Sequence, residues 1–134
     1  MVKIGIVVAN FYKKYADTML KKAKEAAKKL GADTEVIEVP GSFELPIAAL
    51  KLLKRNNIHG VVALGVVMQG ETDHDIIVAE SAARKLMDLS IEFNKPIGLG
   101  IIGPRVNEKQ AEARLEEYAE RSVKAAIEMI KKLS

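Results

Sequence analysis

The sequence predicts an α/β fold: a three-layer sandwich in which helices cover both faces of a four-stranded parallel sheet. Short apolar runs alternate four times with long stretches of helical periodicity along the 134 residues. No linker divides the chain, and its length suits one domain, residues 1–134. With 49% hydrophobic and 29% charged residues, the composition is that of a folded protein and excludes disordered and fibrous classes.

The first two strands and the helix between them follow from their apolar patterns. Residues 2–9 form a continuous apolar run, which is typical of a strand buried on both faces of a parallel sheet. A helix over 13–30 should end at Gly31. Residues 34–39 place glutamates among apolar residues, which favours a strand at the sheet edge. The residues expected on the inner face of the helix are Ala16, Met19, Leu20, Ala23, Ala27 and Leu30.

The remaining elements are bounded by prolines, glycines and caps. The turn 40–42 leads into a second helix that ends near Asn56, with Ser42 as the candidate N-cap. Residues 60–67 are the most apolar run and predict a central strand. A third helix covers 72–93, a fourth strand covers 97–102 after Pro96, and a fourth helix covers 108–133. The core stripe expected on this last helix is Leu115, Ala119, Ser122, Ala126, Ile130 and Leu133.

The order of the strands decides where a ligand should bind. Right-handed crossovers place helices on both faces where the strand order reverses, and we expect the flavodoxin-like order 2-1-3-4. Ligands of such sheets bind beyond the carboxyl ends of the strands. The site is therefore predicted in the four segments that follow the strands, residues 10–12, 40–44, 69–74 and 103–105.

Charge and composition exclude several classes of function. The 21 basic and 18 acidic residues are mixed along the helices, and the few aromatic residues are not interleaved with basic ones, so nucleic-acid binding is not expected. The absence of cysteine removes disulfides and thiolate metal sites. No apolar run approaches the ~18 residues that span a bilayer, and residues 1–5 do not resemble a signal peptide. We expect a cytoplasmic protein with no membrane partner.

His74 is the sharpest candidate for chemistry. It lies at the start of the third predicted helix, where an imidazole can transfer protons near neutral pH and backbone N–H groups, with Gly70, can hold an anion. The alternative is that Thr72 caps the helix and His74 is merely exposed. A metal site built from Glu71, Asp73, His74 and Asp75 is disfavoured, because consecutive helical positions point about 100° apart.

Two further features allow more than one interpretation. Arg114 and Arg121 share a stripe with Tyr118 on the last helix, where a guanidinium could hold phosphate, although solvated arginines are commoner at such positions. Phe11 could stack on a flat heterocycle or pack in a subunit contact. The third helix is apolar around most of its circumference, which favours burial against another subunit over packing within its own chain.

Several segments resemble the lumazine synthase family, in its archaeal version, over essentially the whole chain: residues 39–46, 70–75, 95–97 and the helix that carries Arg114. The resemblance implies condensation of 5-amino-6-ribitylaminouracil with 3,4-dihydroxy-2-butanone 4-phosphate to 6,7-dimethyl-8-ribityllumazine in riboflavin biosynthesis. It implies no metal and no organic cofactor. It also implies small-molecule substrates and a homopentamer or a larger icosahedral shell, with active sites between adjacent subunits.

The resemblance also implies roles for particular residues. His74 would transfer protons, and Arg114 from the neighbouring subunit would hold the substrate phosphate. The backbone of Gly70, Glu71 and Thr72 would hold the same phosphate. Phe11 would stack on the pyrimidine. Ser42 and Glu44 would line the ribityl pocket, backbone groups of Val67 and Met68 would lie near the ring, and Leu99 would form part of the wall of the ring pocket. Gly41 and Phe43 are further implied substrate-binding residues. Glu71, Leu99 and Arg121 depart from residues that are common in the family.

Two other functions stay open at this stage. One is a redesigned or adapted self-assembling cage on the same scaffold, with incidental or lost catalysis; the charged residues on the outer helix faces argue against it. The other is a flavodoxin-like nucleotide binder. That class requires a glycine-rich loop after the first strand, where residues 10–12 read Asn-Phe-Tyr instead.

Overall fold

The sheet has the predicted topology. In the computed structural model, which describes residues 1–134, four parallel strands pair in the order β2-β1-β3-β4. The strands are β1 (Lys3–Ala9), β2 (Asp33–Val39), β3 (Gly60–Met68) and β4 (Ile97–Val106). The helices are α1 (Lys13–Lys29), α2 (Leu45–Leu53), α3 (His74–Phe93) and α4 (Glu108–Leu133), and a short 3₁₀ helix, η1 (Ser42–Glu44), precedes α2.

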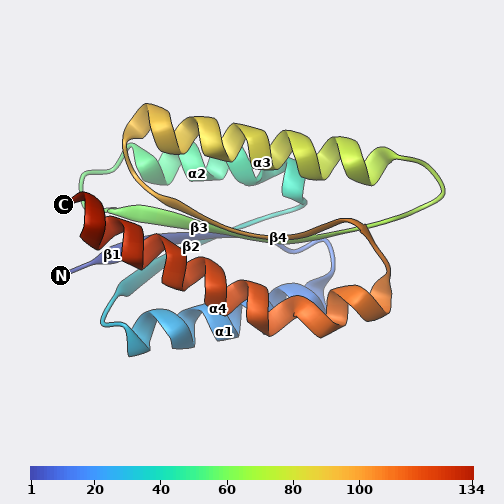
Figure 1. The fold of residues 1–134 in the computed structure, drawn as a ribbon, viewed down its shortest axis with the longest axis horizontal. Coiled ribbons are helices and arrows are strands. Elements are labelled where there is room, and N and C mark those ends of the chain that lie inside the picture. The colour runs from blue at the N-terminus through green and yellow to red at the C-terminus, as the bar shows by residue number, and fades with distance from the viewer.

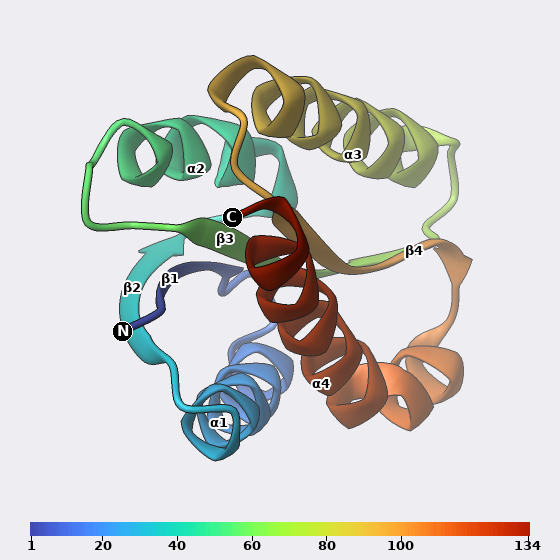
Figure 2. The same cartoon turned by 60° about the vertical axis from the view of Figure 1, so that its left-hand side comes forward.

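The helices form two layers with the sheet between them. Figure 1 shows α2 and α3 above the sheet and α1 and α4 below it, and the view in Figure 2 shows the same separation. Both chain termini lie at one end of the molecule, and the segment between β3 and α3 lies at the other end. The carboxyl ends of the strands, where the site was predicted, therefore lie away from the termini.

The two central strands bury both of their faces. In β1, Ile4, Ile6 and Val8 belong to the core cluster shared with α1 and α4. Val7 and Ala9 belong to the second cluster, shared with α2 and α3. Residues in β3 alternate between the two clusters in the same way. This is why both strands read as continuous apolar runs, and it confirms the central position predicted for residues 60–67 and the edge position of β2.

The predicted core was wrong at the ends of two helices. Leu30 is 39% exposed and Leu133 is 62% exposed, while Ile130 is only partly buried against the core. With 26 residues, α4 is about 39 Å long. The nine residues of β3 span only about 30 Å. The last turn of α4 therefore extends past the layer that it covers.

The second helix ends at Leu53, not near Asn56 as predicted. Lys95, in the segment before β4, reaches across and its Nζ donates hydrogen bonds to the carbonyl oxygens of Leu53 and Arg55, both at 2.8 Å. The ammonium satisfies carbonyl groups at the end of the helix that have no helical partner. The third helix also starts later than predicted, at His74 instead of Thr72.

Strand β4 continues past the predicted end at Ile102. A register shift opposite Val66 and Met68 accommodates the residues after Ile102, and Val106 then pairs with Met68. Gly103 has a φ of 117°, and a Cβ atom there would collide with the carbonyl of Val67. The predicted loop 103–105 is therefore a bulged part of the strand that lies tightly against the end of β3.

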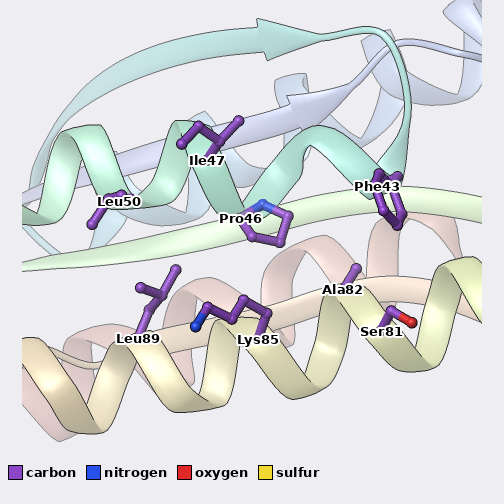
Figure 3. A pocket seen from close by; sticks show the side chains of 8 residues that line it. All are labelled: Phe43, Pro46, Ile47, Leu50, Ser81, Ala82, Lys85 and Leu89. Carbon is purple, nitrogen blue, oxygen red and sulfur yellow. The ribbon is translucent and has the colours of Figure 1, made fainter.

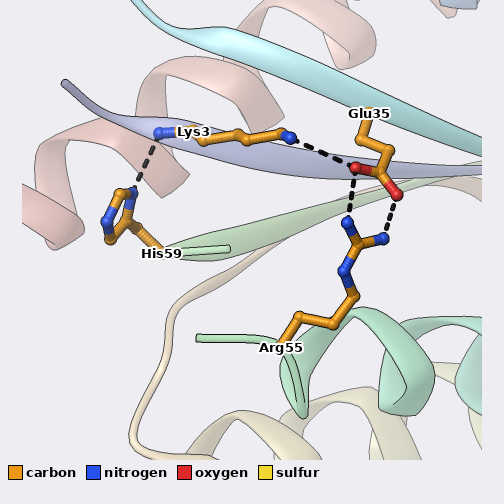
Figure 4. A network of polar contacts seen from close by, with 4 residues as sticks. All are labelled: Lys3, Glu35, Arg55 and His59. Carbon is orange, nitrogen blue, oxygen red and sulfur yellow. Dashed lines mark hydrogen bonds and ion pairs between the residues drawn. The ribbon is translucent and has the colours of Figure 1, made fainter. Parts of the chain in front are cut away.

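A polar network lies at the amino ends of the strands. Figure 4 shows the Glu35 carboxylate between the Arg55 guanidinium, which binds both of its oxygens, and the Lys3 ammonium at 3.2 Å. The hydrogen bonds from Arg55 are the main reason why the pKa of Glu35 is below its usual value. Below Lys3, the ring Nδ1 of His59 accepts a hydrogen bond of 2.9 Å from the Lys3 backbone N–H. The network joins β1, β2 and the segment between α2 and β3.

Candidate active site

A cavity of about 420 Å³ opens at the carboxyl ends of the strands. Its walls come from the turn after β1, the segment from β2 into η1, the end of β3 and the first turns of α3. They include three of the four segments that the strand order predicts, residues 10–12, 40–44 and 69–74; residues 103–105 do not line the cavity. The lining residues are Phe11, Tyr12, Pro40, Gly41, Ser42, Phe43, Glu44, Val66, Val67, Met68, Gly70, Thr72, His74, Asp75 and Val78.

All but three of the predicted site residues line this cavity. Glu71 is exposed and does not line it. Leu99 lies in the middle of edge strand β4, 49% exposed and outside the cavity. Arg114 is exposed on α4, in the opposite helix layer, and its Nη1 donates a hydrogen bond of 2.9 Å to the carbonyl of Gln110. One chain therefore does not bring Arg114 and His74 into the same cavity.

Phe11 is held by a row of aromatic rings. Its ring lies edge-on against Tyr12, with centroids 5.0 Å apart, and Tyr12 packs against Tyr15 at 5.7 Å. The Tyr15 hydroxyl donates a hydrogen bond of 2.9 Å to Glu112 on α4. Desolvation, followed by this hydrogen bond, raises the pKa of Tyr15 to about 12, so the hydroxyl stays protonated and continues to donate. Phe11 itself is 72% exposed, which leaves ring surface free for stacking.

Ser42 is buried, in contrast to its predicted role as an N-cap. The N-cap position of η1 is Gly41, and no side chain caps either η1 or α2. Ser42 is 5% exposed, and its Oγ has no hydrogen-bond partner. A Cβ atom on Gly65 of β3 would collide with this oxygen, so the glycine provides the space that the hydroxyl occupies. The serine thus lies in the wall of the cavity with free hydrogen-bonding capacity.

The start of α3 points its backbone N–H groups toward this end of the sheet. Asp73, not Thr72, occupies the N-cap position, and its side chain makes no capping hydrogen bond. The Thr72 Oγ1 accepts a hydrogen bond of 3.3 Å from the His74 backbone N–H. His74 is exposed at the cavity, and no hydrogen bond within the chain holds its imidazole. The helix terminus supplies partial positive charge beside a free imidazole.

Asp75 is a cavity residue that sequence reasoning missed. The sequence suggests it only as a ligand of the disfavoured metal site, yet Asp75 is buried, with 4% of it exposed. Its Oδ2 accepts a hydrogen bond of 2.8 Å from the Arg105 backbone N–H, and its Oδ1 has no partner. Its burial depends on the bulged end of β4, for which the sequence carries no local signal. Two other lining residues, Val66 and Val78, lie outside the predicted segments. Tyr12 and Pro40 lie within the predicted segments 10–12 and 40–44, but no individual role was predicted for them.

The acidic residues around His74 do not converge. His74 and Asp75 line the cavity, whereas Glu71 and Asp73 do not. The structure holds no group of three or more histidine, aspartate and glutamate side chains arranged to bind a metal ion.

A second hollow, of about 380 Å³, lies between α2 and α3 (Figure 3). Figure 3 shows Leu50, Pro46 and Phe43 along one side and Leu89, Lys85, Ala82 and Ser81 along the other. Phe43 lines both this groove and the cavity that contains His74. Ile47 also lines the groove and is exposed, and α3 carries three further exposed large apolar side chains: Ile77, Met87 and Ile91. None of the helices is both long and apolar enough to cross a membrane.

The family model and the known proteins that this chain resembles all carry the same name. A family model described as 6,7-dimethyl-8-ribityllumazine synthase matches residues 1–134. A protein of that name from Staphylothermus marinus is 52% identical over 131 residues, which cover 97% of this chain and 87% of the relative. Relatives of the same name are 51% identical in Saccharolobus islandicus, over 98% of this chain and 86% of theirs, and 49% identical in Archaeoglobus fulgidus, over 98% and 92%.

Proposed function

The chain belongs to the 6,7-dimethyl-8-ribityllumazine synthase family, and from this premise we propose how its own residues carry out the family reaction. The enzyme is a transferase of riboflavin biosynthesis. It condenses 5-amino-6-ribitylaminouracil with 3,4-dihydroxy-2-butanone 4-phosphate, and the product is 6,7-dimethyl-8-ribityllumazine, with loss of phosphate and water. The observation that supports our residue assignments is that three separate stretches of the chain, residues 11–12, 40–44 and 66–78, converge on the cavity that contains His74.

The pyrimidine substrate binds, in this proposal, between Phe11 and the end of β3. The exposed ring of Phe11 offers a stacking surface and packs in a T-shaped arrangement with Tyr12. Backbone groups of Val67 and Met68 lie at the cavity wall, where they can hydrogen bond to the heterocycle. The ribityl hydroxyls face Ser42, whose Oγ lacks a partner, and Glu44, whose carboxylate accepts hydrogen bonds.

The phosphate of the second substrate binds at the start of α3. The first-turn N–H groups and the hydroxyl of Thr72 supply donors, and the helix dipole favours an anion there. Glu71 and Asp73 are exposed beside this position, so a further cation is needed to offset their charge. We assign that role to Arg114 of the partner subunit, since this chain's own Arg114 is outside the cavity.

His74 is the proton-transfer group of the proposal. After the amine of the pyrimidine forms an imine with the ketone, loss of phosphate requires removal of a proton from carbon, and ring closure requires further proton transfers. An exposed imidazole, free of other hydrogen bonds and close to the phosphate position, is suited to these steps.

The proposed assembly is a homopentamer or a larger homo-oligomer with the site between subunits. The groove between α2 and α3 and the exposed Ile47, Ile77, Met87 and Ile91 form an apolar face that is unusual for a surface in contact with water. Leu99 lies exposed on the edge strand next to α3. Because Phe43 lines both hollows, a subunit that covers the groove would also complete the wall of the cavity.

An assay with both substrates tests the proposed chemistry. The purified protein should form the lumazine, followed by its absorbance. His74→Ala should lower kcat by about 100-fold or more, because it removes the proton-transfer group. Arg114→Ala should instead raise KM for the butanone phosphate more than KM for the pyrimidine, because it removes a phosphate ligand.

Lys124→Ala is the matched control for Arg114→Ala, because Lys124 is exposed on the same helix and pairs with Glu120. It should leave both KM values unchanged. An Arg114→Ala enzyme with an unchanged KM for the phosphate substrate would remove Arg114 from the site. A protein that forms no lumazine would contradict the proposal as a whole.

The two alternatives raised by the sequence gain no supporting observation. The outer residues predicted to be solvated on α1 and α4 are exposed, as on an ordinary protein surface: Lys21, Lys24, Lys28, Lys124, Glu128 and Lys131. The turn after β1 presents the Phe11 ring to the cavity instead of a glycine-rich phosphate loop.

A further inference from the structure

Asp75 is a buried acid in the cavity that the proposed chemistry does not use. It is the second residue of α3, next to His74, and only 4% of it is exposed. Its Oδ1 makes no hydrogen bond. Burying a carboxylate with an unpaired oxygen is costly for a protein, and an apolar residue of similar shape would avoid that cost. The presence of an acid at this buried position is therefore explained best by a role that an apolar residue cannot fill.

The one hydrogen bond of Asp75 joins two elements that are far apart in the sequence. Its Oδ2 accepts from the backbone N–H of Arg105 at 2.8 Å, across 30 residues. Arg105 lies in the bulged end of β4, two residues after Gly103, which packs against the carbonyl of Val67. Beyond the bulge, the Gln69 N–H donates to the carbonyl of Val106 at 2.8 Å. Asp75 thus ties the first turn of α3, through β4, to the end of β3.

The backbone conformation of Arg105 is stabilised by the hydrogen bond to Asp75. Its φ of 63° is in the left-handed region, which residues with a Cβ atom adopt only when their surroundings compensate for the strain. The Arg105 side chain is exposed, so the compensation comes from its backbone N–H and not from its guanidinium.

We propose that Asp75 is a positioning residue: its carboxylate fastens the bulge of β4 to the first turn of α3 and so holds His74 in place opposite the cavity wall made by Val67 and Met68. The inference rests on the proposed function, in which His74 transfers protons to a substrate held at that wall. A displacement of about 1 Å between a catalytic group and its substrate can cost about 100-fold in rate.

Two substitutions of Asp75 test whether this residue acts by positioning His74 or in another way. Asp75→Asn keeps an amide oxygen that can accept from the Arg105 N–H, so it should retain the tie and a kcat close to that of the wild type. Asp75→Leu fills a similar space without an acceptor, and should lower kcat roughly 10- to 100-fold with a smaller change in either KM. If Asp75→Leu does not fold, Asp75→Ala takes its place with the same expectation.

Hydrogen exchange at the Arg105 amide reports the tie directly, and it does not depend on activity. The amide should be protected in the wild type and in Asp75→Asn, and should exchange faster in Asp75→Leu. This measurement keeps its meaning even if the protein forms no lumazine, so failure of the positioning role can be told apart from failure of the proposed function.

Ser90→Ala is the control for a purely structural loss. Ser90 lies on the same helix, near its far end, and its Oγ donates a comparable hydrogen bond of 2.9 Å to the carbonyl of Lys95, before β4. Its loss should lower the melting temperature without lowering kcat.

Three results would overturn the inference: an unprotected Arg105 amide in the wild type, an Asp75→Leu enzyme with wild-type kcat, or an Asp75→Asn enzyme as slow as Asp75→Leu while the amide stays protected. The last result would mean that the charge of Asp75 takes part in the reaction itself.

Discussion

Tyr15 links the stability of the protein to alkaline pH. Its pKa is raised from 10.0 to about 12 in the folded chain, chiefly by desolvation and then by its hydrogen bond to Glu112. A raised pKa stabilises the fold below the pKa of the unfolded chain, and that contribution is lost as the pH rises from about 10 through about 12. The free energy of unfolding, measured by urea titration, should therefore fall over this range more steeply in the wild type than in Tyr15→Phe. Parallel curves for the two proteins would show that the hydroxyl does not contribute.

Glu35 links the stability of the protein to acid pH. The Arg55 and Lys3 side chains lower the pKa of Glu35 below its usual value of 4.5. Its contribution to stability is therefore present above about pH 4.5 and is lost as the pH falls through the lower, folded-state pKa. Glu35→Gln should be less stable than the wild type at neutral pH, and this difference should disappear in acid. Glu38→Gln is the control, because Glu38 lies on the same edge strand and makes no ion pair. An equal loss in both variants would contradict a specific role for the network.

At the scale of single residues, the sequence was informative where chemistry is local. The segment 70–75 is short and polar and follows a buried strand, so His74 could be predicted as a site residue from its neighbours alone. Asp75 could not be assigned in this way. Its burial and its hydrogen bond depend on Arg105, 30 positions later, and acids in a first turn already have an ordinary explanation in the helix dipole.

Among the elements, the close approach of α4 to β4 is the most sensitive contact. A Cβ atom on Gly98 would collide with the backbone carbonyl of Ser122, which cannot rotate away as a side chain could. Gly98→Ala should therefore destabilise the fold by about 2 to 3 kcal/mol, because α4 must move off the sheet. Gly70→Ala should leave the unfolding free energy nearly unchanged, since nothing lies within 4 Å of a Cβ atom there. Equal melting temperatures for Gly98→Ala and the wild type would contradict the steric argument.

The elements themselves could be predicted because their signals are repeated along many residues. The buried runs at 2–9 and 60–67 identified the central strands. The ends of elements depend on distant partners: Lys95 sets the end of α2, and Val106 extends β4 by pairing with Met68 beyond a proline that reads as a strand breaker. Neither partner is visible in a local window of sequence.

For the whole molecule, mixing the two variants tests whether sites lie between subunits, provided that the assay uses butanone phosphate far below the KM of Arg114→Ala, where each variant alone is nearly inactive. A chain with His74→Ala still carries Arg114, and a chain with Arg114→Ala still carries His74. We assume that each site takes His74 from one subunit and Arg114 from its neighbour. Denaturing and refolding equal amounts of the two variants together should then place both intact residues at about a quarter of the interfaces and restore activity there. Refolding each variant alone is the control and should restore none. A mixture that stays as inactive as its components, yet assembles, would place both residues in the same chain's site.

The position of Phe43 has a consequence for how the enzyme responds to dilution. Phe43 lines both the groove between α2 and α3 and the cavity that contains His74. In the proposed assembly, this one aromatic side chain would lie under the neighbouring subunit and over the substrate. Loss of the neighbour would leave this ring without support on one side and would open the cavity to solvent. Turnover per chain should then decline as the concentration falls below that needed for association, so the reaction rate would report the assembly state of the enzyme.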